Sequence, residues 1–202
     1  MIVIGKQNFP WNAFAVGDRL TRQLEDARSQ VTNLQTQFST TTAKLSETTS
    51  RMEAIERAER EKREAESRRR DFAALQDTLS RIATVKPNGN GFVVVLPDSF
   101  FVANQTTLAL RVKGKMDALG QAIAAHPDAT FTVEGHSDSR PTAESFALGR
   151  AQAVADYIAA FLGSRTNFRV ESRGATVPAA SSKTQRGRAM NRRVEIVFVG
   201  PS

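Results

Sequence analysis

Two residues of opposite charge, Asp138 and Arg150, are the strongest candidates for a binding site in this sequence. Asp138 lies just past the carboxyl end of a predicted strand at 130–134, where open α/β sheets leave a crevice for ligands. Arg150 lies between Ala147 and Val154 on the apolar face of the next predicted helix, an odd place for a solvated charge. Two interpretations remain open. Either the two residues form a structural ion pair, or Asp138 accepts hydrogen bonds from an ammonium group while Arg150 binds a carboxylate.

The sequence contains few of the residue types that catalytic or metal-binding sites require. The chain has 2 histidines and no cysteine. His136 stands beside Ser137, but adjacent residues on an extended segment point apart, so they cannot act as base and nucleophile. His136 with Glu134 and Asp138 is a weak candidate for a metal site because no second histidine lies near it. We therefore expect a protein that is not an enzyme, with no cofactor and no metal, in which His136 is structural.

The composition excludes several classes of protein. A chain of 202 residues accommodates one domain, or a modest domain plus an extension. Because cysteine is absent, disulfides, thiolate metal sites and lipid attachment through a cysteine are excluded. The net charge of +7 is spread over both halves of the chain, so no basic module for nucleic acid stands out.

No stretch of the sequence approaches the roughly 18 apolar residues that a membrane-spanning helix needs. The opening MIVIG is also too short for the core of a signal peptide. We therefore expect either a cytoplasmic protein or a targeting or anchoring segment that lies outside this sequence.

A long helix is predicted at 18–86, after an irregular segment at 1–17. Apolar and small residues recur there at alternating steps of four and three, the heptad seam of a coiled coil. The seam residues are Leu20, Leu24, Ala27, Val31, Leu34, Phe38, Thr41, Leu45, Thr48, Met52 and Ile55. Such a helix would extend about 100 Å, too far for a domain made from the remaining residues to cover, which favours pairing with a partner helix.

The seam fades into charged residues between Glu53 and Arg70. Glutamate and arginine stand four residues apart in 5 pairs, such as Glu66 and Arg70. Each pair stabilises a helix by about 0.2–0.5 kcal/mol, so the segment is predicted to be a solvated helical spacer. The turn residues PNGNG at 87–91 then end the helix and form a linker.

Short strands and helices alternate in the last part of the chain, at 92–202. The predicted strands are 92–96, 130–134, 168–172 and 194–199, and the predicted helices are 106–126, 144–162 and 183–191. The strand segments are rich in β-branched residues, and the helices carry apolar residues at helical spacing. This order predicts an α+β fold, a two-layer α/β sandwich in which helices cover one face of a small mixed four-stranded sheet.

Four ordered motifs resemble one protein family. They are VEGHSD at 133–138, GRAQAV at 149–154, Gly174 with Pro178, and GRAMNRRVE at 187–195. The set closely resembles the OmpA-like carboxyl-terminal domain, whose family includes the periplasmic domain of outer-membrane protein A, the peptidoglycan-associated lipoprotein and the flagellar stator protein MotB. The resemblance implies non-covalent binding of peptidoglycan through the meso-diaminopimelate of its stem peptide.

The resemblance also implies roles for individual residues. Asp138 and Arg150 match the family's ligand-binding aspartate and arginine. Asn104 resembles a further contact to the ligand, and Arg192 resembles a flanking one. Three more residues are expected to support the site: His136, Ser137 and Arg188. For Arg188 a simpler role, as a cation at the carboxyl end of a helix, stays open.

The sequence departs from the family's usual pattern near the site. Ser137 stands where threonine is usual, the loop from Asp138 to Arg150 is shorter than in many members, and Ala143 and Ala147 replace polar residues. An altered ligand preference is therefore one expectation.

Together these features predict a cell-envelope tether in the periplasm, associated with the outer membrane. Its expected partners are peptidoglycan, further copies of the chain through the long helix, and a membrane protein. The alternative is a structural or assembly protein with an OmpA-like fold that has little peptidoglycan binding and recruits a partner through its coiled coil. Nucleic-acid binding is disfavoured because no aromatic residues are interleaved with the arginines.

Overall fold

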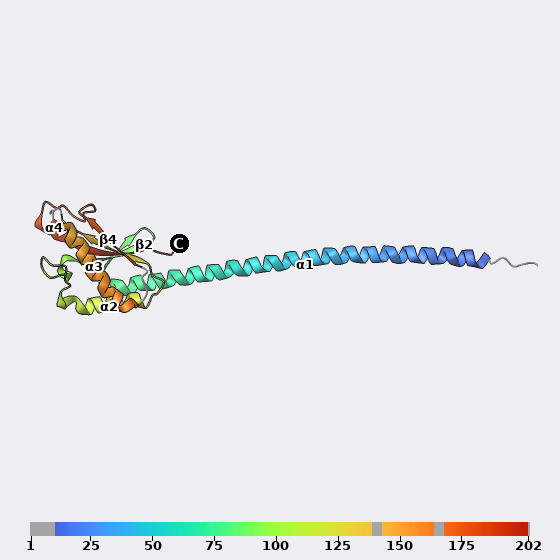
Figure 1. Ribbon diagram of the computed structural model, residues 1–202, viewed down its shortest axis with the longest axis horizontal. Helices are drawn as coiled ribbons and strands as arrows, with labels where there is room; N and C mark the ends of the chain where they lie inside the picture. The colour runs from blue at the N-terminus through green and yellow to red at the C-terminus, as the bar shows by residue number, and fades with distance from the viewer. Residues whose placement is uncertain (1–10, 139–142, 164–167, 202) are drawn as a thin grey trace, which may run out of the picture. The chain divides into compact units, whose positions relative to one another are not determined.

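The computed structural model describes residues 11–138, 143–163 and 168–201 (Figure 1). The chain divides into two compact units, Met1–Glu61 and Lys62–Ser202. In chain order the elements are α1 (Trp11–Ser80), β1 (Thr84–Asn88), β2 (Gly91–Pro97), the 3-10 turns η1 (Asp98–Phe100) and η2 (Leu110–Val112), α2 (Lys113–Ala124), β3 (Phe131–His136), α3 (Ala143–Leu162), β4 (Phe168–Gly174), α4 (Gln185–Asn191) and β5 (Arg193–Phe198). Among the described residues, no helix is both long and apolar enough to cross a lipid bilayer.

The boundaries of α1 differ from the prediction at both ends. The helix begins at Trp11, so the predicted irregular segment is wrong for 11–17, while 1–10 lie outside the described residues. It ends at Ser80 instead of Lys86, because Thr84–Asn88 form strand β1 and pair antiparallel with β2. The predicted linker at 87–91 is thus the end of β1 and the hairpin turn, where Gly89 adopts a φ of 58°.

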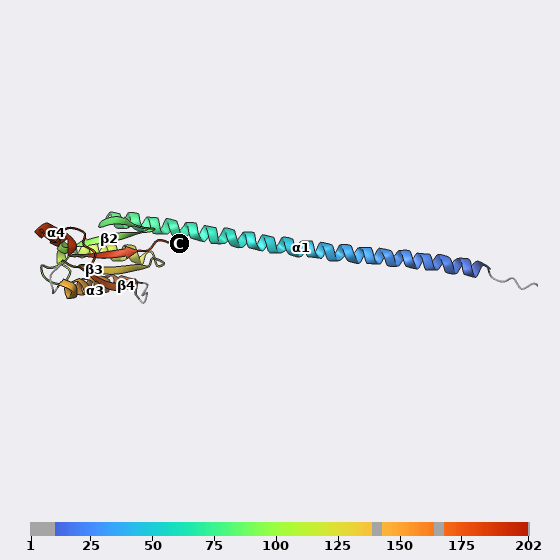
Figure 2. The ribbon, with the colours of Figure 1, turned by 90° about the horizontal axis from the view of Figure 1, so that it is seen from above.

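The sheet has 5 strands in the order β1-β2-β5-β3-β4, rather than the four that were predicted (Figure 2). Only β3 and β4 are parallel among its neighbouring pairs, so the predicted mixed sheet is confirmed. The additional strand is β1 at the edge. An edge strand tolerates Pro87, which has no N–H to donate.

The helices pack against one face of this sheet. Side chains on that face alternate along the strands and are buried: Phe92, Val94, Leu96, Phe131, Val133, Val194, Ile196 and Phe198. Residues of α2 and α3 join the same core, as do Leu75 and Leu79 from the last turns of α1. The ring of Phe72 lies 5.0 Å from that of Phe92, which stacks at 4.7 Å on Phe198. The predicted two-layer architecture is therefore confirmed, with the end of α1 as a third covering helix.

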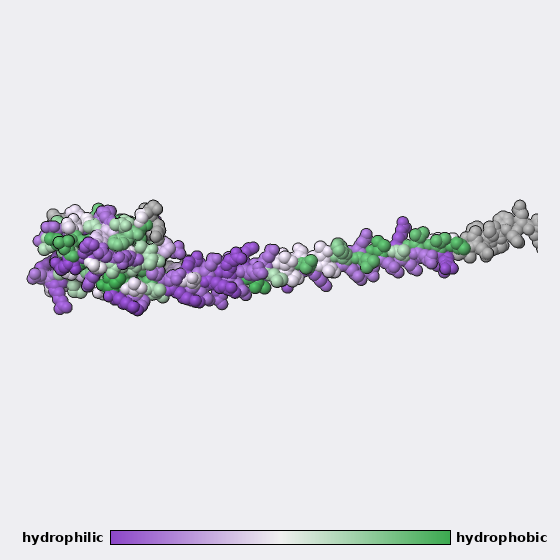
Figure 3. Space-filling view, turned by 90° about the horizontal axis from the view of Figure 1, so that it is seen from below, coloured by the Kyte–Doolittle hydropathy of each residue, from purple (hydrophilic) through white to green (hydrophobic). Residues whose placement is uncertain are grey.

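The amino-terminal unit leaves its apolar residues exposed. The large seam residues from Leu20 to Ile55 are 53–76% exposed. Figure 3 shows these hydrophobic side chains along the amino-terminal part of α1 and a hydrophilic stretch nearer its other end. In that charged stretch the expected pair of Glu66 and Arg70 is present, with a distance of 3.6 Å between Oε2 and Nη2.

We expect Leu79→Ala to lower the free energy of unfolding of the carboxyl-terminal unit by about 2–5 kcal/mol, because a fully buried leucine would leave a cavity. Urea titration followed by fluorescence or circular dichroism measures this change. The matched control is Leu110→Ala, which removes a leucine that is 91% exposed and should alter stability by less than about 0.5 kcal/mol. Equal effects of the two variants would show that the last turns of α1 do not belong to the core.

Candidate ligand-binding site

A tight contact between β3 and α3 brings Asp138 and Arg150 to the same end of the sheet. Gly135 of β3 lies against Ala147 of α3, and a Cβ atom at Gly135 would overlap the carbonyl oxygen of Ala147. The missing side chain lets the two backbones touch. Arg150 follows Ala147 by about one helical turn, and Asp138 lies just past the end of β3. Both charged residues therefore project from the same junction.

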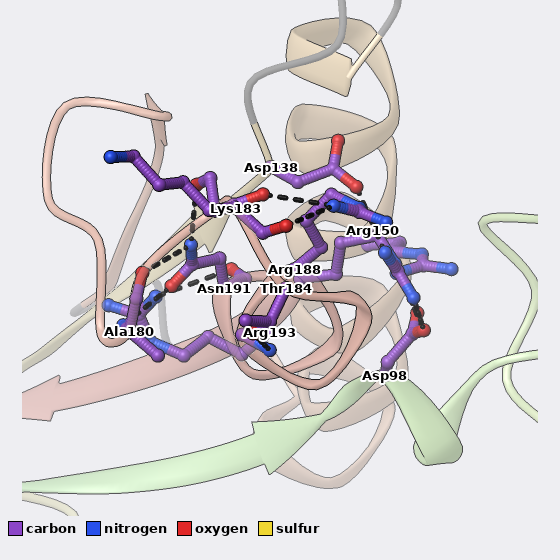
Figure 4. A network of polar contacts seen from close by, with 12 residues as sticks. Asp98, Asp138, Arg150, Ala180, Lys183, Thr184, Arg188, Asn191 and Arg193 are labelled. Carbon is purple, nitrogen blue, oxygen red and sulfur yellow. Dashed lines mark hydrogen bonds and ion pairs between the residues drawn. The ribbon is translucent and has the colours of Figure 1, made fainter.

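Asp98, a carboxylate that was not predicted as a site residue, joins them. It lies at the start of η1, directly after β2. Arg150 Nη1 donates to Asp98 Oδ1 at 2.6 Å, while Arg192 Nη2 and Nε donate to Asp98 Oδ2 at 2.7 and 3.0 Å. Arg192 Nη1 also donates to Asp138 Oδ2 at 2.9 Å. Asp138, Arg192, Asp98 and Arg150 thus form a chain of alternating charge, the charged cluster (Figure 4).

Arg150 forms its ion pair with Asp98 and not with Asp138, so the direct ion pair considered from the sequence is wrong. Its Nε donates to the carbonyl oxygen of Gln105 at 2.9 Å. Its guanidinium carbon also lies 4.8 Å from the centre of the Phe101 ring. These contacts explain how a charge is accommodated on the buried face of α3.

The charged cluster is buried at one side and open at the other. Asp138 and Arg150 are 1% and 5% exposed, whereas the side chains of Asp98 and Arg192 are 29% and 25% exposed. Burial raises the pKa of Asp98, but hydrogen bonds from Arg192 and Arg150 outweigh burial and hold that pKa below its usual range. The hydrogen bond to Asp98 raises the pKa of Arg192. Both groups therefore stay charged at neutral pH, and the open edge presents both signs of charge.

Helix α4 positions Arg192, the residue that follows it. Thr184 begins the helix by accepting a hydrogen bond from Gly187 N at 3.0 Å. At the other end the buried Asn191 accepts from Ala180 N at 2.8 Å and donates to Ala180 O at 2.9 Å. These two hydrogen bonds fasten the loop before α4 to the end of the helix. They thereby fix the position of the Arg192 backbone, from which its side chain extends to the cluster.

Arg188, expected as a supporting residue, binds this same loop. Its Nη1 donates to the carbonyl oxygens of Ser182 and Lys183 at 3.0 and 3.3 Å (Figure 4). Its support of the site is therefore indirect, because it holds the loop and α4 together beside Arg192.

Asn104, expected as a further ligand contact, shapes a turn next to the cluster. Its φ is 56°, a left-handed conformation that asparagine tolerates better than most residues. The turn is closed by a hydrogen bond from Gln105 N to Val102 O at 3.0 Å. Gln105 also supplies the carbonyl that binds Arg150. A direct contact from the exposed Asn104 to a ligand stays a prediction.

The two residues at the end of β3 are buried, His136 at 2% and Ser137 at 5% exposure. Ser137 N donates to Gly174 O at 2.9 Å, which ties the strand end to β4. His136 Nε2 lies 3.3 Å from Glu195 Oε2. Burial raises the pKa of Glu195, but contacts with His136 and Arg193 outweigh burial and lower the pKa from 4.5 to about 2.

Residues 100–192 match the sequence model of the OmpA family. This part of the chain is similar to an OmpA-like domain. A peptidoglycan-associated lipoprotein from Legionella pneumophila is 34% identical over 101 residues, which cover 48% of this chain and 57% of that protein. An outer membrane protein A from Bordetella avium is 34% identical over 112 residues, which cover 54% of this chain and 57% of that protein. The chain thus spans little more than half the length of these relatives.

Among solved structures, the cell wall anchor of the T6SS from Pseudomonas aeruginosa is similar to this chain. The TM-score is 0.55 at 28% sequence identity, and the match covers 64% of this chain and 96% of that one. The family resemblance predicted from the four motifs is confirmed, and so is the predicted fold of the OmpA-like domain, with β1 as an extra strand.

Glu195→Gln is expected to reduce the loss of stability in acid. A carboxyl group whose pKa is lowered by folding stabilises the folded state above its unfolded pKa, and this contribution disappears as the pH falls from 4.5 towards about 2. The shift corresponds to at most about 3 kcal/mol. We expect the free energy of unfolding in urea to fall less in Glu195→Gln than in the wild type between about pH 6 and about pH 3.

The control for this experiment is Glu61→Gln, which changes an exposed carboxylate of α1 and should keep the wild-type dependence on pH. A Glu195→Gln variant with the same dependence as the wild type would contradict the assignment of the low pKa to this residue.

Proposed function

We propose that this chain binds peptidoglycan non-covalently, through the meso-diaminopimelate of the stem peptide, and tethers an envelope complex to the cell wall. The proposal is supported by relatives that are a peptidoglycan-associated lipoprotein and a cell wall anchor. Such a protein works in the periplasm in association with the outer membrane, and a membrane-protein complex is its expected partner. No catalytic step is part of this function.

The observation that carries the proposal is the charged cluster itself, in which two carboxylates and two guanidinium groups meet (Figure 4). The free end of diaminopimelate carries an ammonium and a carboxylate on the same carbon. The ammonium donates to Asp138, and the carboxylate accepts from Arg150, whose Nη2 forms no hydrogen bond with the described residues. Arg192 flanks the ligand, while Asp98 holds both guanidinium groups in place.

A second candidate function rests on the strength of the contacts within the cluster. Asp98 already neutralises Arg150 through a bond of 2.6 Å, so the cluster would also stabilise the domain with no ligand bound. In that case the chain is an assembly protein that has an OmpA-like fold, binds little peptidoglycan and recruits a partner through α1.

Sedimentation with purified sacculi distinguishes these functions. We expect Asp138→Asn and Arg150→Gln to fold but to sediment at least about tenfold less than the wild type with diaminopimelate-type sacculi, because each variant removes one charge-assisted contact to the zwitterion. The fraction of protein in the pellet is measured as a function of the amount of sacculi. Thermal unfolding establishes beforehand that each variant is folded.

The matched controls are Asp128→Asn and Arg186→Gln, which change exposed residues of the same types outside the charged cluster and should sediment like the wild type. Lysine-type sacculi lack the second carboxylate and should bind more weakly. Wild-type protein that stays in the supernatant would favour the assembly function. Variants that sediment as the wild type does would refute the site, and equal binding to both types of sacculi would refute diaminopimelate recognition.

We also propose that the chain forms homo-oligomers through the seam of α1. The seam leaves side chains such as Leu24, Leu34 and Phe38 at 64%, 63% and 76% exposure. Burying one such side chain is worth about 1.5–3 kcal/mol, and a second copy of the same helix offers a complementary seam. Two linked domains on a polymeric wall also gain from effective concentration, so each domain needs only modest affinity.

Sedimentation equilibrium of the intact chain should give the mass of a dimer or a larger oligomer. The double variant Leu24→Glu/Leu34→Glu is expected to be monomeric, because it places charges in the seam. The control variant Ser29→Glu/Thr36→Glu adds the same charge on the opposite side of the heptad and should stay oligomeric. A wild-type protein that is monomeric at all concentrations would end this proposal.

A further inference from the structure

Three side chains that could ligate a metal ion converge on the side of the sheet that faces away from the helices. Glu134 and His136 come from β3, and Glu195 comes from β5. His136 Nε2 lies 3.3 Å from Glu195 Oε2 and 3.7 Å from Glu134 Oε2. The three ligand atoms all lie within 4.8 Å of one another. They therefore surround a single point.

The two carboxylates stand directly opposite each other in the antiparallel pair of β3 and β5. Like charges at such positions destabilise a sheet unless cations compensate them. One oxygen of each carboxylate is compensated: Arg173 Nη2 binds Glu134 Oε1 at 2.7 Å, and Arg193 Nε binds Glu195 Oε1 at 2.6 Å. The other oxygen of each lies near the imidazole of His136. Arginines in this position orient the carboxylates, as outer groups do around metal sites.

The imidazole of His136 is the second observation that points to a ligand. Its side chain is 1% exposed, and neither ring nitrogen forms a well-directed hydrogen bond within the part of the chain that the structure describes. Buried polar atoms nearly always have a partner. A neutral imidazole can donate from Nε2 to only one of the two facing carboxylates, whereas a metal ion bonds to all three groups.

We propose that Glu134, His136 and Glu195 bind a divalent transition-metal ion, with Zn²⁺ as the probe. Zinc binds imidazole nitrogen and carboxylate oxygen at about 2.0–2.2 Å, so neighbouring ligands of a tetrahedral site lie about 3.3–3.6 Å apart. The distances of 3.3 and 3.7 Å from Nε2 are close to this spacing before any adjustment. Three protein ligands leave the fourth position to water.

A metal ion at this point would join β3 to β5, the two strands that lie next to Asp138 and Arg192 of the charged cluster. His136 stands two residues before Asp138, and Glu195 stands three residues after Arg192. The ion would stabilise the pairing of β3 with β5 at the end of the sheet where Asp138 follows β3 and Arg192 precedes β5. This proposal does not depend on peptidoglycan binding, since its ligands lie outside the cluster.

Calorimetric titration of the metal-free, untagged full chain with Zn²⁺ tests the site. The chain has 2 histidines and no cysteine, so competing sites are few. We expect one Zn²⁺ per chain, and a loss of affinity of more than about tenfold in His136→Asn and Glu195→Gln, because even outer-shell changes at metal sites cost 10–100-fold. Glu134→Gln is a second variant of the same kind. The matched control is His126→Asn, which should keep wild-type affinity.

Titration with Co²⁺ supplies an independent measurement, since a tetrahedral site gives strong visible absorption that should disappear in His136→Asn. Saturating Zn²⁺ should raise the melting temperature of the wild type and of His126→Asn but not of His136→Asn. The proposal is overturned if the wild type binds no Zn²⁺, or if His136→Asn and Glu134→Gln both bind as the wild type does.

Discussion

The close approach of β3 and α3 at Gly135 is the constraint on which the site depends. Any side chain at this position would collide with the backbone of Ala147 and push the helix away from the strand. The distance between Asp138 and Arg150 is therefore set by contact between two backbones and not by flexible side chains. A site for a small zwitterion needs this kind of rigid spacing, because its two charges are separated by only one carbon atom.

The need to compensate the buried charge of Arg150 then brings the ends of β2 and α4 to the same site. A buried arginine that lost its partner would destabilise the fold by several kcal/mol, so Arg150 requires a carboxylate within reach. Asp98 meets this need from the end of β2, and it also binds Arg192 from the end of α4. One carboxylate thus joins three parts of the domain that are distant in the sequence. Asp98 and Arg192 are partly exposed and present both signs of charge at the open edge, whereas Asp138 and Arg150 are buried behind them.

Local patterns in the sequence were sufficient for most of the fold. The strands and helices after residue 91 follow from β-branched runs and helical spacing, and the four motifs identified the family. The helix predicted at 106–126 is wrong at its start, because Leu108 forms a bridge with Phe101 and α2 begins only at Lys113. The end of α1 was misplaced because residues 18–86 contain no proline or glycine that would mark an earlier end, whereas the decisive factor is the pairing of β1 with β2. That pairing is tertiary, so helical periodicity carries no signal for it.

The same distinction applies to the charged residues. Asp138 and Arg150 were recognisable from their places on a strand end and a helix face. Asp98 and Glu195 were not, because each acts on a partner far away in the chain: Asp98 binds Arg150 across 52 positions. Glu195 changes the interpretation of His136 in particular. Within β3, Glu134 is the acidic residue on the same side of the strand as His136. The second carboxylate, Glu195, comes next to His136 only because β5 pairs with β3.

The last turns of α1 finally bear on how a tether of this kind would work. Phe72, Leu75 and Leu79 pack with the core of the OmpA-like domain, so the helix is joined to the domain by buried side chains and not by the linker predicted at 87–91. A load applied along the helix would act on apolar contacts and on β1, the edge strand that follows and pairs with β2. The charged cluster lies beyond these contacts, at the ends of β2, β3 and α4. The core therefore lies between the end of α1 and the charged cluster, so a pull on the helix would act on the core before it acted on the proposed binding residues.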